Sequence, residues 1–338
     1  MSPTKLPTGK VSKELLRKYV FTCLGIPDKR IIAGPMIGED AAIIDTGDTV
    51  LIAKANPITG AEKKIGWLSV HINANDVVVR GASPRWFMSV VLLPEDSEEV
   101  LLETIMREQH EACSELGVCI IGGHTEVAPD LGRPIVSGFM LGEARKDEYI
   151  TTSGAQVGDH IILTKGVGLE GTGILAADLH EKLMGNVSEE MLDNAVNFLD
   201  LISVVPEAKT AMEIDGIHSM HTPTEGGVIN GLLEMSEASG NGFKVYEDLM
   251  LIHEETRVIS NVLSVDPLRL LSSGSLMIVV DPEKSDELIN LLISRNILSK
   301  IIGEVTPDSK VLVRSDGSEE YVDDVVQDEL FRVLAENT

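Results

Sequence analysis

In each half of this chain, short apolar runs alternate with stretches of helical periodicity. This repeated alternation limits the folds that the chain can adopt. Between residues 40 and 143, short apolar runs alternate with longer stretches of helical periodicity. A polar, turn-rich stretch at 143–158 follows, and a second series of the same kind begins at residue 160. Short strands that alternate with helices are typical of α/β units. We therefore predict an α/β (α+β) fold with two domains, residues 1–150 and 155–338.

The elements that this pattern predicts have definite positions in each domain. In the first domain we expect strands at 41–44, 50–53, 86–93, 118–121 and 135–141, and helices at 65–80 and from 96 or 97 to 117. In the second domain we expect strands near 160–164, 243–246, 275–280 and 300–305, and helices near 172–183, 189–201 and 226–239.

The chain is strongly acidic, with 54 Asp and Glu residues against 28 Lys and Arg residues and a formal net charge of −26. Such a surface repels a phosphate backbone, so we expect no nucleic-acid partner. It also repels a bare nucleotide. A phosphate ligand therefore needs a metal ion or clustered backbone amides at its site.

Hydropathy and cysteine content favour a soluble, cytoplasmic protein with no membrane contact. No stretch approaches the roughly 20 apolar residues that a spanning helix requires, and residues 1–10 lack the apolar core of a secretory signal. The three cysteines, Cys23, Cys113 and Cys119, show no metal-ligand spacing. We expect them to be reduced thiols in the core.

Two acidic positions stand beside apolar segments and are candidate ligands. Asp40 lies in Gly38–Ala42, at the start of an apolar strand, where a turn acid that caps the strand is the simpler interpretation. Asp76 lies in an apolar helix, in the run 73–82 (NANDVVVRGA). Asn and Asp are poor residues for a helix interior. Their presence there indicates a metal or phosphate site, or else a buried capping network.

Three glycine-rich segments are candidate phosphate sites. Gly122 and Gly123 follow an apolar strand and precede His124, and paired glycines there would free amides for an anion. The segment 166–173 has the spacing G-x-G-x-x-G at Gly166, Gly168 and Gly171, and Gly226 and Gly227 open a helix. The G-x-G-x-x-G spacing also fits a dinucleotide site. However, the acids about 20 residues further on fall in a predicted helix, which argues against hydride transfer.

Six motifs in this order resemble the PurM-like (AIR synthase-related) superfamily, and the resemblance runs over nearly the whole chain. The TPTEGG sequence before a helix is most similar to the hydrogenase-maturation branch, HypE and its archaeal-type relatives. The motifs are GEDAA at 38–42, NPITGA at 56–61, NANDVVVRGA at 73–82, GGHTEV at 122–127, the glycine-rich loop at 166–173 and PTEGG at 223–227.

The resemblance implies a definite architecture and ligand. The first domain would dimerise through its sheet into a β-barrel, and a second α/β domain would pack beside it. ATP would bind with magnesium at the cleft, and a maturation-type protein partner is a further possibility. By position, Asp40 and Asp76 match the acids that hold metal-bound phosphates, and Gly122 and Gly123 match the turn beneath them.

The chain departs from the superfamily pattern at three site positions. Asn56 and Thr222 stand where members usually carry Asp, and His124 stands where Asp is frequent. Asn and Thr still offer neutral oxygens to magnesium, but each exchange removes a negative charge from the metal site. Lys54, two residues before Asn56, is expected on the same strand face and adds a positive charge there.

Two hypotheses of function remain open at this point. The first is an ATP-dependent enzyme that transfers a phosphoryl group to an oxygen acceptor. The second is a degenerate, non-catalytic homodimer that serves as a binding or assembly partner. HypE proper ends in a cysteine-bearing tail, whereas residues 329–338 contain no cysteine, so the HypE reaction itself is not assigned from the sequence.

Overall fold

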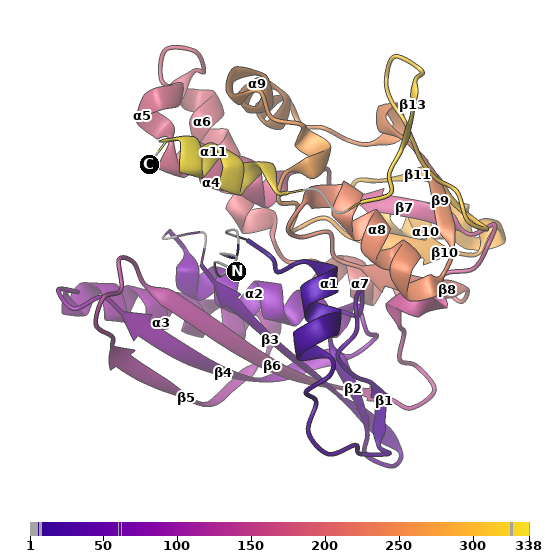
Figure 1. The fold of residues 1–338 in the computed structure, drawn as a ribbon, viewed down its shortest axis with the longest axis horizontal. Coiled ribbons are helices and arrows are strands. Elements are labelled where there is room, and N and C mark those ends of the chain that lie inside the picture. Colours follow the sequence, from indigo (N-terminus) through magenta and orange to yellow (C-terminus); the bar gives the residue numbers. More distant parts are fainter. Residues whose placement is uncertain (1–5, 7–8, 60, 62, 325–326, 338) are drawn as a thin grey trace, which may run out of the picture.

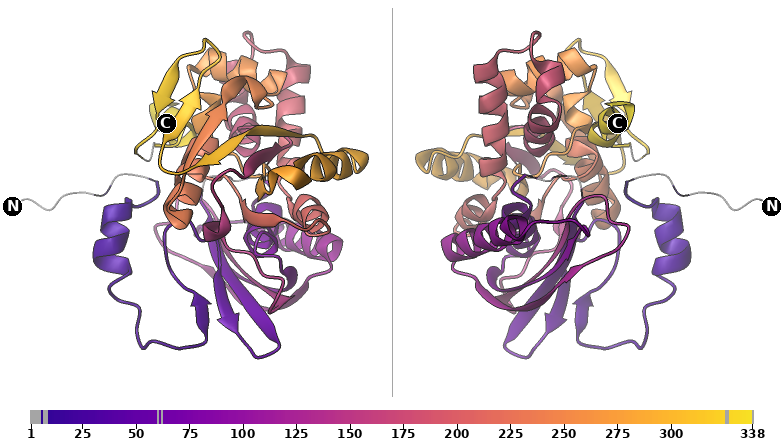
Figure 2. Two further views of the ribbon diagram at one scale, coloured as in Figure 1. Left: turned by 90° about the vertical axis from the view of Figure 1, so that its right-hand side faces the viewer. Right: turned by 90° about the vertical axis from the view of Figure 1, so that its left-hand side faces the viewer.

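The computed structural model describes all residues except 1–5, 7–8, 60, 62, 325–326 and 338, and it contains two β-sheets with helices packed against them (Figure 1). The first sheet comes from residues 31–145 and the second from residues 160–321. The two units lie directly against each other in all views (Figure 2). The predicted α/β class is confirmed.

The first sheet has six strands in the order β1-β2-β3-β6-β4-β5. All neighbours are antiparallel except β4 and β5, which are parallel and joined through a helix. The strand predicted at 118–121 is present as β5, but it is an edge strand and every residue of β5 is exposed. The strands are β1 Ile31–Ala33, β2 Ala42–Asp45, β3 Thr49–Ile58, β4 Ser83–Leu93, β5 Cys119–Val127 and β6 Ile135–Arg145.

Two helices cover one face of this sheet. α2, Ile65–Val78, is buried along nearly its whole length because it lies between the first sheet and the second unit. Gly138 of β6 allows its close approach, since a Cβ there would lie 2.5 Å from the Asn73 amide nitrogen. α3, Glu99–Leu116, is amphipathic and ends at Gly117, which has a φ of 70°.

The second sheet has seven strands in the order β13-β12-β9-β11-β7-β10-β8. Figure 1 shows α4, α5, α6, α9 and α11 gathered beside it. The strands are β7 His160–Thr164, β8 Ile217–His221, β9 Gly242–Tyr246, β10 Met277–Val280, β11 Ser299–Thr306, β12 Lys310–Val313 and β13 Glu319–Tyr321. The helices are α4 Leu169–Asp178, α5 His180–Leu183, α6 Glu189–Val196, α7 Val205–Ala211, α8 Gly227–Ser239, α9 Glu254–Leu263, α10 Pro282–Ser294 and α11 Glu329–Asn337.

The N-terminal segment carries the short helix α1, Lys13–Leu15, which continues as a π-helical turn to Val20. No helix in the described part of the chain is long and apolar enough to cross a bilayer. Of the cysteines, all of them free, Cys113 is buried as expected. Cys23 and Cys119 are exposed, because one lies in the N-terminal segment and the other on the edge strand, so for these two the expectation of core thiols is wrong.

One apolar core joins the two units. Val77 and Val78 of α2 belong to the same buried cluster as Val205 and Ala208 of α7 and residues of the second sheet. Asn75 adds a polar link, because its amide donates to the Ile202 carbonyl at 2.8 Å and its oxygen accepts from the Val204 amide at 2.9 Å. For Asn75, the capping network that the sequence left open is the correct interpretation.

His71 of α2 is fully buried, and neither ring nitrogen has a hydrogen-bond partner among the described residues. Its ring packs against Trp67, with the centroids 4.2 Å apart. Burial, together with the nearby charge of Lys165, lowers the pKa of His71 to about 4. The folded protein therefore strongly favours the neutral ring.

We expect this histidine to make the fold sensitive to acid. Because the unfolded chain binds the proton at a higher pH than the folded one, the free energy of unfolding should fall by about 2 kcal/mol between pH 7 and pH 5. Urea unfolding at the two pH values measures this loss. The His71→Leu variant should lose clearly less stability over that interval, and an equal loss in both proteins would show that His71 is not the cause.

Candidate functional site

Four polar side chains meet where the first sheet, α2 and the end of β8 come together. Asp76 of α2 is 4% exposed, and both of its carboxylate oxygens are engaged. Oδ2 accepts from the Asn56 amide at 2.7 Å and lies 2.9 Å from the Lys54 ammonium nitrogen. Oδ1 accepts from the Thr222 hydroxyl at 3.0 Å. The structure thus brings together Asp76, Asn56 and Thr222, three of the four predicted metal ligands.

The strand period explains why Lys54 and Asn56 share this location. Side chains two residues apart in a strand leave on the same face. In β3 the buried residues Val50 and Ile52 face the helices, and the same alternation directs Lys54 and Asn56 toward α2. The sequence-based expectation that Lys54 shares the face of Asn56 is therefore confirmed.

Asp40, the fourth predicted ligand, is held in a second cluster beside the first. Its Oδ2 lies 3.0 Å from His221 Nδ1 and 3.1 Å from an Arg80 guanidinium nitrogen. The other ring nitrogen of His221, Nε2, lies 3.0 Å from a carboxylate oxygen of Glu234 in α8. A histidine between two carboxylates has both nitrogens placed to donate, which is the arrangement of an imidazolium.

The charges in this cluster shift its pKa values. Burial would lower the pKa of His221, but the carboxylates of Asp40 and Glu234 outweigh it and raise the pKa to about 9. Burial would raise the pKa of Asp40, yet the net pKa lies below its usual range because His221, Arg80 and Lys54 are positively charged. At neutral pH the cluster therefore contains charged pairs.

Arg80 connects the residues before β2 to the second unit. Its side chain is fully buried at the end of α2. It donates to Glu39 at 2.7 Å and to the Thr152 hydroxyl at 2.8 Å, as well as to Asp40 and the Met220 carbonyl. Glu39 in turn accepts from the backbone amide of Thr152 at 3.2 Å.

The N-terminal segment closes over the other side of the cluster. The Lys10 ammonium lies 3.0 Å from Glu234, and the Lys10 amide donates to Glu225 at 2.7 Å. The net pKa of Glu234 is lowered, because Lys10 and His221 outweigh the opposing effect of burial. Sequence reasoning did not single out Lys10, Arg80, His221 or Glu234. An arginine at the end of an otherwise apolar predicted helix was the one signal that could have indicated this cluster.

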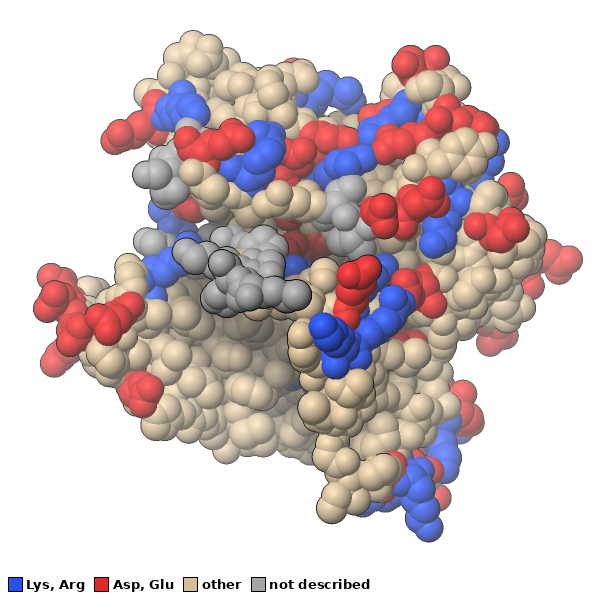
Figure 3. Space-filling view, viewed as in Figure 1, with Lys and Arg blue, Asp and Glu red and all other residues tan. Residues whose placement is uncertain are grey.

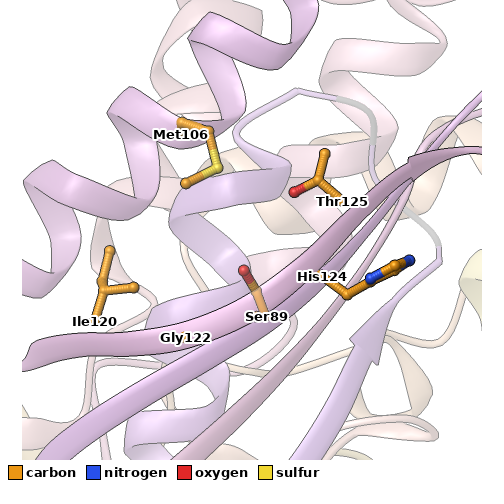
Figure 4. Close-up of a pocket in the computed structure, with 7 residues that line it drawn as sticks. Ser89, Met106, Ile120, Gly122, His124 and Thr125 are labelled. Carbon is orange, nitrogen blue, oxygen red and sulfur yellow. The ribbon is translucent and has the colours of Figure 1, made fainter.

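Gly122, Gly123 and His124 lie elsewhere, within the exposed edge strand β5. The paired glycines are paired with Met88 and Ser89 of β4, so they form strand and not the turn that the resemblance implied. They border a shallow depression of about 290 Å³ beside Met106 of α3. Figure 4 shows His124 pointing away from Met106, and its Nε2 lies 3.0 Å from exposed Glu126.

The glycine-rich loop at 166–171 is packed against its own unit. The Gly168 amide donates to the Ser272 hydroxyl at 2.8 Å, and the Gly171 amide donates to the Leu271 carbonyl at 2.9 Å. A Cβ at Gly171 would lie 2.5 Å from the Leu270 side chain. Close packing therefore accounts for these glycines, and the role of Gly166, Gly168 and Gly171 in binding a cofactor stays a prediction.

Gly226 and Gly227 open α8 with φ values of 82° and 66°. The Gly226 amide donates to the Asp328 carboxylate at 2.5 Å, and the Leu330 amide donates to the same carboxylate at 2.7 Å. Burial raises the pKa of Asp328 to about 6. A carboxylate of the chain itself therefore occupies this turn, and the role of Gly226 and Gly227 in binding a cofactor stays a prediction.

The residues around Asp76 do not suit an anchored magnesium ion. Magnesium requires oxygen ligands, preferably carboxylates. Here Asn56 and Thr222 both direct hydrogen atoms at Asp76, and an ammonium occupies the side of the carboxylate where a cation would bind. Within the described residues, no cluster of three or more His, Cys, Asp or Glu side chains is arranged to hold a metal ion.

Known proteins share this fold and this sequence pattern. The N-terminal domain of the AIR synthase related proteins matches residues 38–144, and their C-terminal domain matches residues 156–315. The chain therefore belongs to the AIR synthase-related family. It is 28% identical over 337 residues to a protein of Methanocaldococcus jannaschii that carries the provisional name hydrogenase expression/formation protein, covering 96% of this chain and 97% of that one.

Solved structures confirm the fold. The HypE–HypF complex gives a TM-score of 0.75 at 22% identity, covering 91% of this chain and 99% of that chain. HypE in complex with ATP gives 0.70 at 20% identity, with coverages of 96% and 97%. AaThiL complexed with AMPPCP and TMP gives 0.72 at 17% identity, with coverages of 93% and 97%. The predicted membership in the PurM-like superfamily is confirmed.

The placement of His221 between two carboxylates predicts its titration. In an NMR titration of the imidazole signals, His221 should show a pKa of about 9, and both of its nitrogens should be protonated at pH 7. The Glu234→Gln variant should lower that pKa, because one of the two negative charges is removed. The His221→Gln variant assigns the signal, and a native pKa near 6.5 would contradict the charged cluster.

Proposed function

We propose that this protein binds ATP at the junction of its two units and transfers a phosphoryl group from it to an oxygen acceptor. The observation that carries the proposal is that four cationic groups of an acidic chain lie at one place, each paired with a carboxylate, and that the Lys54 side chain is partly exposed there. Lys54, Arg80, His221 and Lys10 all lie at the junction, three of them beside Asp40 or Asp76. Positive groups fixed in a partly buried site are what a phosphate chain requires.

The fold relatives support this interpretation. HypE was solved with ATP, and AaThiL was solved with AMPPCP, on the same two-unit fold. The HypE–HypF complex supports a protein partner of the maturation type for this chain as well. Magnesium as the companion of the nucleotide and the cytoplasmic location stay predictions from the sequence.

Asp40 should matter for turnover because it holds His221 in place and keeps it protonated. In the Asp40→Asn variant we expect ATP-dependent release of ADP to fall at least about tenfold, since a prepositioned charge is lost from the site. Calorimetric titration with ATP and an assay for released ADP, with water or an added hydroxyl compound as acceptor, measure binding and turnover separately.

Asp45→Asn is the matched control for this experiment. Asp45 belongs to β2, close to Asp40 in the chain, but its ion pair with Lys146 lies on the surface. The control should behave as the native protein. A folded native protein that binds no ATP, with or without magnesium, would overturn the proposal of a nucleotide site.

A second candidate is a non-catalytic homodimer that acts as an assembly partner, and one observation favours it. The Asp76 carboxylate is already satisfied by Asn56, Thr222 and Lys54, so the site is complete without a metal ion. ATP binding without any release of ADP, whichever acceptor is supplied, would support this candidate over the enzyme.

Under either function we propose that two chains associate through the first sheet and close a β-barrel. The face of this sheet opposite α2 carries partly exposed apolar residues, among them Met88, Val90 and Phe139. Figure 3 shows a broad, nearly uncharged and hollowed surface over β4, β5 and β6. Exposed apolar patches of this kind mark protein interfaces.

The dimer is tested by sedimentation equilibrium at micromolar concentration. The native chain should sediment as a dimer, and Phe139→Asp should shift it to the monomer, because a carboxylate would be buried against the apolar face of the partner. Tyr321→Asp is the control, since Tyr321 is 67% exposed on β13 of the other sheet. A native chain that is entirely monomeric would overturn the dimer.

A further inference from the structure

Lys54 stands at the position where an anchored cation would be expected. It extends from β3 to within 2.9 Å of Asp76 Oδ2, and it also contributes positive charge to Asp40. These are the two carboxylates that the sequence assigned to a metal-bound phosphate. The Lys54 side chain is 21% exposed, so it reaches the surface of the junction.

The charge balance of the site is the same whether the cation is a divalent metal ion or the Lys54 ammonium. Two aspartates with one divalent ion have the same total charge as one aspartate and one asparagine with one ammonium. The chain has Asn56 where the resemblance implied an Asp, and Lys54 lies two residues away on the same face. The loss of a negative charge at 56 is thus matched by the gain of a fixed positive charge.

The ammonium of Lys54 also has the capacity to hold a second anion. A lysine carries three N–H donors. One is directed at Asp76, and among the residues that the structure describes no other hydrogen-bond or ion-pair partner of Lys54 is found. Two donors therefore remain for oxygen atoms that approach from the exposed side of the junction.

Resting on the proposed nucleotide site, we infer that the Lys54 ammonium holds the phosphate chain of a nucleoside triphosphate directly, in place of a divalent ion anchored at Asp76 and Asn56. Asp76 keeps the ammonium in position, and Asn56 and Thr222 keep the carboxylate of Asp76 oriented. The nucleotide therefore binds without needing a divalent ion anchored at Asp76 and Asn56.

Calorimetric titration of the full chain with ATP, once with EDTA and once with excess magnesium, tests this inference. The native protein should bind ATP in both, with affinities within about threefold of each other. Lys54→Met removes the charge but keeps the length of the side chain, and it should weaken binding in EDTA by at least about tenfold, the usual effect of losing a hydrogen bond from a charged group. Lys54→Arg should retain binding.

Two further variants sharpen the result. Lys146→Met is the control, because Lys146 also pairs with an aspartate of the first sheet, at 2.6 Å, but on the surface. It should leave ATP affinity unchanged. The double variant Lys54→Met with Asn56→Asp supplies an aspartate pair without the ammonium, and it should bind ATP only when magnesium is present.

The outcomes separate the inference from the function on which it rests. Binding of ATP by the native protein in magnesium but not in EDTA would overturn the role of Lys54 and leave the nucleotide site standing. The same would follow if Lys54→Met, shown to be folded by circular dichroism, bound ATP in EDTA as well as the native chain does. Failure of the native protein to bind in either condition would overturn the proposed function itself.

Discussion

The buried guanidinium of Arg80 is the interaction on which the junction depends. It lies at the end of α2, is fully buried, and bonds to Glu39 and Asp40 before β2, to Thr152 in the connection between the units, and to the Met220 carbonyl of β8. A buried charge is tolerated only when it is paired and hydrogen-bonded. The four segments must therefore meet at one point for the protein to fold, and that requirement fixes Asp40 and His221 beside Asp76.

The site that results is a balanced array of charges in a chain that is otherwise acidic. Lys54 pairs with Asp76, His221 bridges Asp40 and Glu234, and Lys10 from the N-terminal segment pairs with Glu234. In each of these ion pairs, the two residues come from different elements of the chain. A ligand that carries negative charge meets the partly exposed Lys54 ammonium here, in contrast to most of the surface, where the net charge of −26 would repel it.

The backbone amides of the glycine motifs can bind either a phosphate ligand or groups of the protein itself. The sequence predicted phosphate turns at 166–173 and 223–227, since glycine frees backbone amides. In the folded chain those amides are taken, by Ser272 and Leu271 in the first segment and by Asp328 in the second. These hydrogen-bond partners lie about 100 residues further along the chain, so no local sequence pattern could have predicted them.

Local sequence determined much of the secondary structure. Periodicity and turn residues located β2 to β6 of the first sheet, α2, α3, β7 and α8, because these elements are apolar enough to be recognised alone, but they missed the three-residue strand β1. The local sequence did not indicate α7, β8, α9 and α10, because their apolar content is weaker or mixed with charge. The sequence also singled out Asp40, Asn56, Asp76 and Thr222. Only the tertiary structure could decide that Asp76 pairs with Lys54 and that Asp40 pairs with His221. Asp40 and His221 are 181 positions apart, so their hydrogen bond depends on how the two sheets pack and not on the local sequence around either residue.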